Sequence, residues 1–331
     1  MLIQISEIQE TMLNILLQRG YSTEDSELII DVYLGGELRG QPTHGLAPFP
    51  EYAKHDFSRC AEPEVILHSH SVFYIDAKGN SGIAIARRAA DEAIEIAQTE
   101  GIGTAIIKNM KDWSRPGAIA HYVAKKKCIG VVTNIGSGLA LAPPGGYDPT
   151  LGTNPIAFAF PTLDTPLEIE MATSKRAWGN IRIANKYGTD LPVDTFLTDT
   201  GASATKPSEA HSVEAFGGHK GFAISMLIAM LNGPMLGNAM LNEADATDFS
   251  KPWPPNSGTI TVYDPELFGG YEAFVKETSK GIDEIKSTHP LPNQVIRIPG
   301  EGAKARSAEA IDKGSIEVPE VLWAEITSLL E

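Results

Sequence analysis

The sequence predicts a mixed α/β fold in which strands and helices alternate along the middle of the chain. Short runs of branched apolar residues alternate there with Ala-rich or amphipathic stretches. Apolar residues at helical spacing recur at both ends of the chain, which predicts flanking helical regions. No GxGxxG motif follows a predicted strand, so the sequence does not indicate a Rossmann domain.

The elements follow from periodicity and from helix start and stop signals. Ser22 and Asp25 resemble a capping box, which marks the start of the second N-terminal helix. The helices are predicted over residues 5–19, 24–38, 46–57, 82–99, 118–127, 222–232, 266–288 and 319–330. The strands are predicted over residues 72–76, 104–108, 129–134, 156–160, 168–171 and 259–263. Gly, Pro and small residues dominate from Ser137 to Pro161, where they predict fixed turns.

The composition is typical of a soluble globular enzyme with two domains. The chain has 331 residues, of which 42% are hydrophobic and 21% are charged. No apolar run approaches the about 20 residues that span a bilayer, and the N-terminus resembles no signal peptide. Cys60 and Cys128 form no CxxC pair, so we expect free thiols, no metal site and a cytoplasmic location.

The net charge excludes polyanionic partners. Lys and Arg number 27 against 42 Asp and Glu, which makes the chain −15 at pH 7. Such a field repels nucleic acid and anionic membranes, so we expect a small-molecule substrate instead. An anionic cofactor would therefore need basic groups placed close to it.

Two segments offer such basic groups. The run from Gly217 to Gly221 stands at a predicted helix start, where backbone N–H groups and Lys220 suit an anion. The segment Ala172-Thr173-Ser174-Lys175-Arg176 follows a strand and offers two hydroxyls and two cations. The alternative for each segment is a structural turn with solvated side chains.

Two further segments carry groups suited to catalysis or substrate binding. His44 lies in a polar loop, and histidine is the usual general acid near neutral pH, although a loop histidine is commonly only a surface residue. Asp112, Trp113 and Arg115 follow a strand end, where charged groups beside a Trp suit a ligand pocket. A surface turn accounts for this second segment equally well.

Taken in order, several motifs resemble the malate/L-lactate/ureidoglycolate dehydrogenase family over nearly the whole chain. They are Thr43-His44-Gly45, Gly101-x-Gly103, Asn109-x3-Trp113-x-Arg115-x-Gly117, Gly152-Thr153-Asn154-Pro155, Met171-Ala172-Thr173-Ser174, Leu191-Pro-Val-Asp194, Gly217-Gly-His219-Lys220-Gly221 and Ile298-Pro-Gly300-Glu301. The Trp-x-Arg and Leu-Pro-Val-Asp motifs are similar to the 2,3-diketo-L-gulonate reductase branch. Reductases of cyclic imino acids share residues 152–158 and 217–221.

The resemblance implies a non-Rossmann fold and NAD(P)H-dependent reduction of a 2-keto acid by a homodimer. It implies a nucleotide-binding domain over residues 111–269 and a substrate and dimerisation domain over 1–110 with 270–331. It places catalysis at His44, the proton donor, and at Asp112, and substrate contacts at Trp113, Arg115 and Thr153. It places cofactor contacts at Glu170, Met171, Ala172, Thr173, Ser174, Lys175, His219, Lys220, Gly300, Glu301 and Gly302.

The chain departs from the family pattern at three positions: Pro48 replaces an Arg, Asp112 a His and Glu170 an Asp. The pocket thus loses two potential cations and gains an anion. Either Arg115 takes the substrate carboxylate while Asp112 pairs with His44, or the substrate presents a neutral or cationic group to Asp112. Reduction of a cyclic imino acid and a catalytically silent nucleotide-binding role remain alternatives, and the choice between NAD and NADP stays open.

Overall fold

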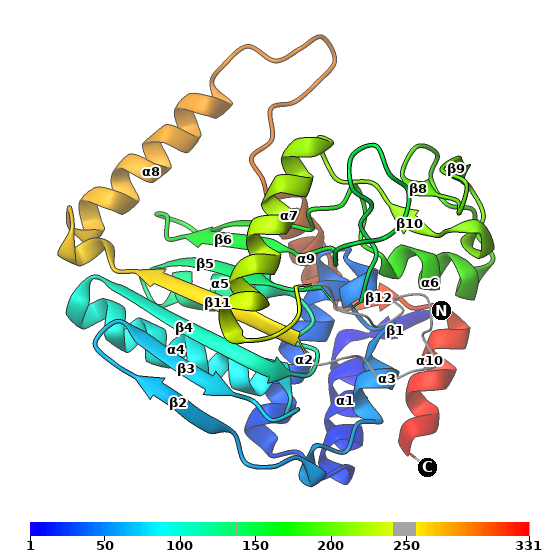
Figure 1. Ribbon diagram of the computed structural model, residues 1–331, viewed down its shortest axis with the longest axis horizontal. Helices are drawn as coiled ribbons and strands as arrows, with labels where there is room; N and C mark the ends of the chain where they lie inside the picture. Colours follow the sequence, from blue (N-terminus) through cyan, green and yellow to red (C-terminus); the bar gives the residue numbers. More distant parts are fainter. Residues whose placement is uncertain (137, 241–255, 331) are drawn as a thin grey trace.

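The computed structural model describes residues 1–136, 138–240 and 256–330 and has a seven-stranded sheet at its centre (Figure 1). In spatial order the strands are β2 (Glu64–His68), β3 (Val72–Asp76), β4 (Ile102–Met110), β11 (Asn256–Tyr263), β5 (Ile129–Asn134), β6 (Ile156–Phe160) and β7 (Leu167–Met171). Only β3 and β4 run parallel; every other neighbouring pair in this sheet is antiparallel. A Rossmann sheet is mostly parallel, so the predicted mixed, non-Rossmann class is confirmed.

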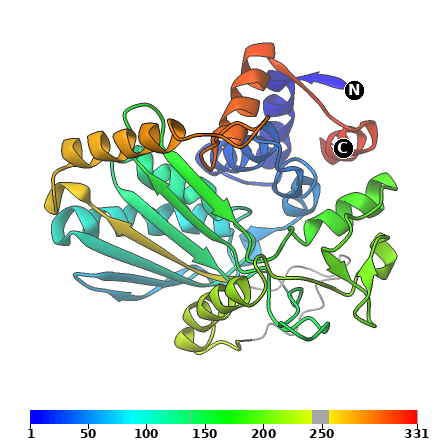
Figure 2. The ribbon, with the colours of Figure 1, turned by 90° about the horizontal axis from the view of Figure 1, so that it is seen from above.

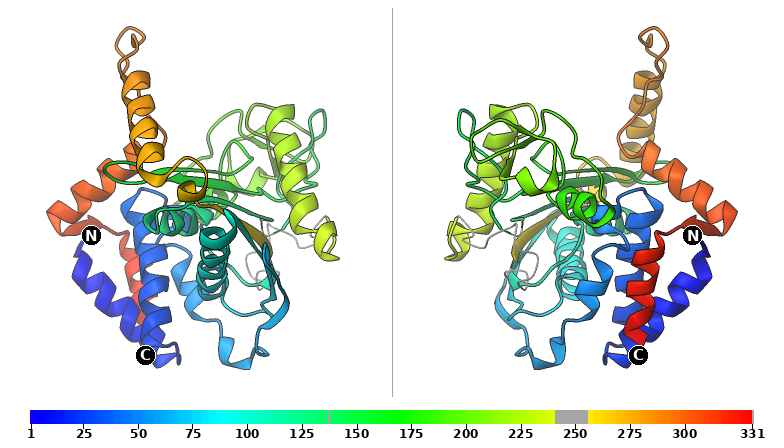
Figure 3. Two further views of the ribbon diagram at one scale, coloured as in Figure 1. Left: turned by 90° about the vertical axis from the view of Figure 1, so that its left-hand side faces the viewer. Right: turned by 90° about the vertical axis from the view of Figure 1, so that its right-hand side faces the viewer.

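Helices cover both faces of the sheet (Figure 3). α4 (Gly82–Glu100) and α5 (Pro116–Lys125) pack on one face, where Val132 and Ile260 are fully buried against them. α7 (His219–Asn232) lies on the other face, where the Asn232 amide donates to Thr133 and accepts from Thr259. This division follows from the pleat, because successive side chains of a strand point to opposite faces.

The two ends of the chain build a helical layer beside the sheet (Figure 2). It contains α1 (Ile5–Gln18), α2 (Thr23–Leu38), α3 (Phe49–Ala53), α9 (Glu301–Lys313) and α10 (Glu320–Thr327). The short strands β1 (Leu2–Gln4) and β12 (Ser315–Glu317) pair antiparallel and bring the two ends of the chain together. The predicted flanking helical regions are therefore confirmed.

A smaller unit follows β7 and has its own apolar core. It contains α6 (Gly179–Tyr187) and a sheet of β8 (Phe196–Leu197), β9 (Ser203–Ala204) and β10 (Ser212–Val213). Trp178 and Phe196 pack in this core with ring centroids 6.1 Å apart. The unit matters for the site because α6 returns toward the helical layer.

α8 (Tyr271–Lys286) projects from the body of the molecule (Figures 1 and 3). Val275 is its one buried residue. Most of the other side chains of this helix therefore face solvent in the single chain.

Several predicted boundaries differ from the structure. The helix predicted over residues 46–57 is the short α3 followed by a 3-10 turn at Phe57–Arg59. Pro50 stands in the first turn of α3, and Pro48, its N-cap, cannot donate a backbone hydrogen bond. The helix predicted over 266–288 starts at Tyr271, after a glycine pair. Ser137, where the predicted Gly- and Pro-rich stretch begins, lies outside the described residues.

The predicted division into residues 1–110 with 270–331 and residues 111–269 stays a prediction. Both parts contribute strands to the same sheet, and residues 241–255 lie outside the described part. Cys60 and Cys128 are both free, but only Cys128 is buried. Within residues 1–136, 138–240 and 256–330, no helix is long and apolar enough to cross a membrane, and no cluster of His, Cys, Asp and Glu suits a metal ion.

Candidate functional site

His44 ends a 3-10 turn (Pro42–His44) between α2 and α3. The side chain keeps part of its surface exposed, and Thr43 Oγ1 lies 2.9 Å from the imidazole Nδ1. The backbone behind it is packed closely: a Cβ at Gly36 of α2 would lie 2.4 Å from the His44 carbonyl oxygen. The ring is thus carried on a closely packed backbone, with Thr43 beside its Nδ1.

Asp112 lies close to His44, in the segment that follows β4. Ser114 of the same segment donates its hydroxyl to the His44 carbonyl at 3.4 Å. Asp112 Oδ2 accepts from the Tyr33 hydroxyl at 2.9 Å, and Oδ1 accepts from the Ser114 amide at 2.8 Å. These two bonds orient the carboxylate from α2 and from its own loop.

Nearby charges and burial act in opposite directions on the pKa values of His44 and Asp112. Burial lowers the pKa of His44, whereas the Glu170 and Asp112 carboxylates raise it in part. Burial also raises the pKa of Asp112, against the hydrogen bonds from Ser114 and Tyr33. The net direction for His44 is down, so neutral imidazole is favoured in the single chain.

Arg115 lies behind this pair in a network of buried charges. It is 2% exposed, donates from Nη1 to the Gln41 amide oxygen at 2.8 Å, and donates from Nη2 to Glu168 Oε1 at 3.1 Å. Its Nε lies 3.7 Å from Glu170 Oε2. Two carboxylates of β7 therefore surround the guanidinium that the sequence predicts for the substrate.

The side chains of Glu170 and Glu168 also contact protein groups other than Arg115. Glu170 Oε1 accepts from the Gly117 amide at 3.0 Å, and a Cβ at Gly117 would lie 2.4 Å from Glu170 Oε2. Glu168 also pairs with Arg39 at 3.6 Å and with His121 at 3.3 Å. Burial alone would raise the pKa of Glu168, but His121, Arg115 and Arg39 hold it below its ordinary value.

The predicted cofactor segments meet around β7 and the turn that follows it. Thr173 donates both its amide and its hydroxyl to the Thr153 carbonyl, at 2.9 and 2.8 Å. Its own carbonyl accepts from the Phe216 amide at 3.0 Å, just before the Gly217–Gly221 loop. A Cβ at Gly300 would lie 2.5 Å from the Glu168 carbonyl, so the third segment abuts the same strand.

The start of α7 is open. Gly217 and Gly218 have φ of 56° and 62°, and no heavy atom lies within 4 Å of a Cβ at either position. His219 and Lys220 in the first turn are exposed. A cation and the positive end of the helix dipole at an open glycine pair together suit an anionic group.

The remaining predicted residues differ in their exposure and in the protein groups that they contact. Met171 is exposed, Ala172 is half-buried, and the Ser174 hydroxyl donates to the Arg176 carbonyl at 2.7 Å. Lys175 Nζ pairs with Glu214 at 2.5 Å. Glu301 pairs with Lys286 at 2.6 Å beside Gly302. Trp113 is 2% exposed and packs against Gly258 of β11.

Sequence reasoning missed several residues near His44. Tyr33, Glu51 and Arg182 come from α2, α3 and α6, and Arg182 Nη1 donates to Glu51 Oε2 at 2.8 Å. No motif marks these positions. Glu168 could have been found, because it stands two residues before Glu170 in β7 and therefore on the same strand face.

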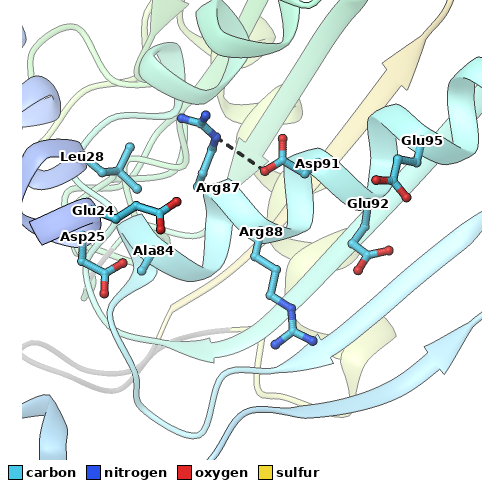
Figure 4. A pocket seen from close by; sticks show the side chains of 9 residues that line it. All are labelled: Glu24, Asp25, Leu28, Ala84, Arg87, Arg88, Asp91, Glu92 and Glu95. Atoms are coloured by element: carbon cyan, nitrogen blue, oxygen red, sulfur yellow. Dashed lines mark ion pairs between the residues drawn. The ribbon is translucent and has the colours of Figure 1, made fainter. Parts of the chain in front are cut away.

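A separate surface groove lies between the start of α2 and α4 (Figure 4). Its walls carry mainly carboxylates together with Arg87 and Arg88, and Arg87 lies 3.6 Å from Asp91. None of the predicted site residues lines this groove. It is thus distinct from the cluster around His44.

The chain resembles known dehydrogenases and reductases over most of its length. It is 30% identical over 300 residues to the L-sulfolactate dehydrogenase of Methanothermobacter thermautotrophicus, covering 87% of this chain and 86% of that protein. It is 27% identical over 337 residues to Delta(1)-pyrroline-2-carboxylate reductase 1 of Burkholderia ambifaria, covering 99% and 97%. It is 25% identical over 344 residues to the 2,3-diketo-L-gulonate reductase of Klebsiella pneumoniae, covering 99% and 100%.

The fold agrees with these similarities. The solved structure of the sulfolactate dehydrogenase of Methanocaldococcus jannaschii superposes with a TM-score of 0.87 at 25% identity, covering 99% of this chain and 96% of that one. The sequence pattern of the malate/L-lactate dehydrogenase family matches residues 3–327. The chain therefore belongs to the malate/L-lactate dehydrogenase family of NAD(P)-dependent oxidoreductases, which act on CH–OH or C=N groups.

Proposed function

We propose that this protein uses NADH or NADPH to reduce a small 2-keto acid to the 2-hydroxy acid, with His44 as the proton donor. The observation that carries the proposal is the partly exposed His44 ring beside the Asp112 carboxylate, on a backbone fixed by close packing against α2. A histidine with nearby carboxylates can hold a proton and release it to an oxyanion.

Thr43 and Asp112 have different parts in this step. In the protonated ring the Thr43 hydroxyl oxygen accepts from Nδ1–H, so Nε2–H is the proton given to the substrate and the neutral ring keeps its proton on Nδ1. Asp112 supports the protonated ring through its charge, and Tyr33 and Ser114 hold Asp112 in place. Donation from His44 neutralises the oxygen that becomes the product hydroxyl. The reverse transfer serves oxidation of the hydroxy acid.

The nicotinamide nucleotide supplies the hydride when it is bound. The open glycine pair at positions 217 and 218, with Lys220 in the first turn of α7, fits a phosphate of that nucleotide. Thr173 and Thr153 hold the turn after β7 next to this loop, where Met171, Ala172 and Ser174 also lie. We assign Glu170, Lys175, His219 and the segment from Gly300 through Glu301 to Gly302 to the same cofactor region.

Two classes of substrate are candidates. The relatives named above carry the names of sulfolactate, diketogulonate and pyrroline-carboxylate enzymes at 25–30% identity, so identity does not rank these substrates. A 2,3-diketo-L-gulonate-like, malate-like or lactate-like acid therefore stands beside a cyclic imino acid. The full-length similarity to the pyrroline-carboxylate reductase supports this second candidate. Substrate contacts by Arg115, Trp113 and Thr153 stay predictions.

We also propose a homodimer in the cytoplasm. Apolar side chains that a monomer would leave in water support the dimer: Leu227, Met230 and Leu231 of α7 and Met235 after it are 37–57% exposed. The two free thiols are compatible with a reducing compartment.

His44→Gln tests the proposed function, because glutamine cannot be a general acid. The turnover number for reduction should fall by roughly 10²- to 10⁴-fold, while the dissociation constant for NAD(P)H stays the same. Because burial lowers the pKa of His44, the wild-type reduction rate should fall as pH rises through a value below the ordinary histidine pKa. The pH profile of His44→Gln should lack this fall in rate.

His211→Gln is the control, because His211 pairs with Asp148 at 2.9 Å in another part of the molecule. It should keep wild-type rates and the wild-type pH profile. Wild-type turnover in His44→Gln would refute the proton-donor role. Nucleotide binding without NAD(P)H oxidation by any keto acid, hydroxyketone or cyclic imine would favour the silent alternative.

A further inference from the structure

We infer that Tyr33 of α2 is a positioning residue for the proposed reaction: its hydroxyl keeps Asp112 a carboxylate beside His44, and so sets the pH range in which His44 donates its proton. This inference rests on the proposed function and deepens it. Tyr33 acts through Asp112 and does not itself contact the substrate.

Tyr33 reaches Asp112 from a buried position. Its side chain is 0% exposed, and its ring packs against Phe49 and Tyr52 with centroids 5.9 and 5.3 Å away. The hydroxyl donates to Asp112 Oδ2 at 2.9 Å. Burial and the Asp112 charge raise the pKa of Tyr33 well above its ordinary value, so the hydroxyl keeps the proton that it donates. A tyrosine held by close packing therefore offers Asp112 a fixed donor.

The two oxygens of Asp112 receive donors of different kinds. Oδ1 accepts from the Ser114 amide of the same loop, whereas Oδ2 accepts from Tyr33 of a distant helix. Hydrogen bonds to a carboxylate favour its ionised form and oppose the effect of burial. The amide is part of the backbone, so the Tyr33 hydroxyl is the donor that a substitution can remove.

The same helix also holds the turn that carries His44. Glu37, four residues after Tyr33, accepts from the Leu46 amide through Oε2 at 2.8 Å. Gly36 lies against the His44 carbonyl, where a Cβ would come within 2.4 Å. Helix α2 thus contacts both members of the His44–Asp112 pair and fixes their relative position.

Charged groups from several elements face this pair. Besides Asp112, those that act on His44 are Glu170 of β7, Arg115 before α5 and Arg182 of α6. Besides Tyr33, the titratable groups coupled to Asp112 are His44, Arg182, Glu51 and Tyr52, together with His55 after α3. Tyr33→Phe changes none of these charges directly, so its effect on His44 is expected to pass through Asp112.

The direction of that effect follows from the two pKa values. Burial lowers the pKa of His44, and the Asp112 carboxylate opposes this in part. Burial raises the pKa of Asp112, and the bonds from Ser114 and Tyr33 oppose that. Without the Tyr33 hydroxyl, Asp112 takes up a proton at higher pH and loses the charge that supports protonated His44. His44 then becomes neutral at lower pH than in the wild type.

Tyr33→Phe and Tyr52→Phe form a matched pair for the test. Both tyrosines are fully buried in the same aromatic cluster, and each hydroxyl bonds a side chain of another segment, Asp112 or Ser81. NMR of the protein labelled with 13C at histidine Cε1 and saturated with NAD+ or NADP+ measures the titration midpoint of His44. The signal of His44 is identified by its loss in His44→Gln.

In Tyr33→Phe the midpoint of His44 should fall by about 0.5–1 pH unit, a part of the 1–3 units that a nearby opposite charge contributes. Tyr52→Phe should keep the wild-type midpoint although its melting temperature falls to a similar extent. Asp112→Asn should lower the midpoint at least as far as Tyr33→Phe does. Adding Tyr33→Phe to Asp112→Asn should give no further fall, because the charge through which Tyr33 acts is gone. With pyruvate as the 2-keto acid, the pH at which reduction declines should shift by the same amount.

Equal His44 midpoints in Tyr33→Phe and Tyr52→Phe would overturn the role of Tyr33. A shift of undiminished size when Tyr33→Phe is added to Asp112→Asn would overturn the route through Asp112. An unshifted midpoint in Asp112→Asn alone would do the same, and this variant keeps the test decisive if Tyr33→Phe does not fold. The midpoint is measured without substrate, so these results are distinct from failure of the proposed function. That failure would appear as absent keto acid reduction in the wild type.

Discussion

Replacing Arg115 by glutamine separates a structural role of this arginine from a substrate contact. The guanidinium is 2% exposed and lies within 3.1–3.7 Å of two carboxylates of β7. Glutamine keeps a polar group next to Gln41 but removes the charge. Glu168 would keep Arg39 and His121, whereas Glu170 would keep only neutral partners among those described above.

The expected loss of stability can be estimated from this arrangement. Breaking a buried ion pair by removing one partner costs about 3–5 kcal/mol. Because Arg39 and His121 still contact Glu168, we expect about 3 kcal/mol. An unfolding entropy of about 2.1 cal/mol/K per residue gives about 0.7 kcal/mol/K for this chain, so the melting temperature should fall by about 4 °C.

The stability that Arg115 contributes depends on pH, and the direction follows from Glu168. Arg115 helps to hold the pKa of Glu168 below its ordinary value in the folded protein. Such a group stabilises the fold above its unfolded pKa, and this stabilisation is lost as pH falls through the folded pKa. The difference in stability between wild type and Arg115→Gln should therefore be largest near neutral pH and should shrink in acid.

Differential scanning fluorimetry over pH and steady-state kinetics on the same samples provide the assay. Arg39→Gln is the matched control, because Arg39 contacts the same Glu168 at 3.6 Å with a side chain that is 23% exposed. Arg39→Gln should lower the free energy of unfolding by about 0–1 kcal/mol. An unchanged melting temperature together with a more than tenfold rise in KM would refute the reasoning. Arg115 would then be primarily a substrate ligand.

Two further predictions concern the cofactor and assembly. Lys220→Ala should raise the nucleotide dissociation constant about tenfold or more, because a charged hydrogen bond is worth about 1.5–3 kcal/mol; Lys276→Ala, on the exposed side of α8, is the control. Unaltered binding by calorimetry would make the loop at positions 217–221 purely structural. Sedimentation should give a mass near twice 35.5 kDa at micromolar concentration, and a monomer mass would contradict the homodimer.

Local patterns located most of the regular elements. β3, β5 and β6 have the predicted bounds, and the start of α2 has the predicted cap, with Ser22 accepting from the Asp25 amide. These elements carry a strong apolar period or a specific cap. β2, α6 and α9 were missed. β2 has the apolar residues Val65, Ile66 and Leu67 in direct succession, without the alternation that marks a half-buried strand, and all three are exposed. α9 has no buried residue, and α6 has only two.

In the candidate site, too, local patterns located some residues and missed others. His44, Asp112 and Lys220 could be singled out because their residue types and neighbours suit acid chemistry or anion binding. Tyr33 and Arg182 could not, because each contributes to the site through contacts with residues 79 and 131 positions away in sequence. No local motif encodes such a contact.

The sequence by itself determined the mixed α/β class, the helical ends and the segments that carry polar chemistry. It did so because periodicity, caps and glycine-rich turns act over a few residues. Only the tertiary structure decided that residues 256–263 enter the sheet between β4 and β5, and that Arg115 is surrounded by Glu168 and Glu170. It also brought Arg182 next to the His44 turn. These outcomes depend on which distant surfaces bury one another, and that choice is made by packing and charge across the whole chain.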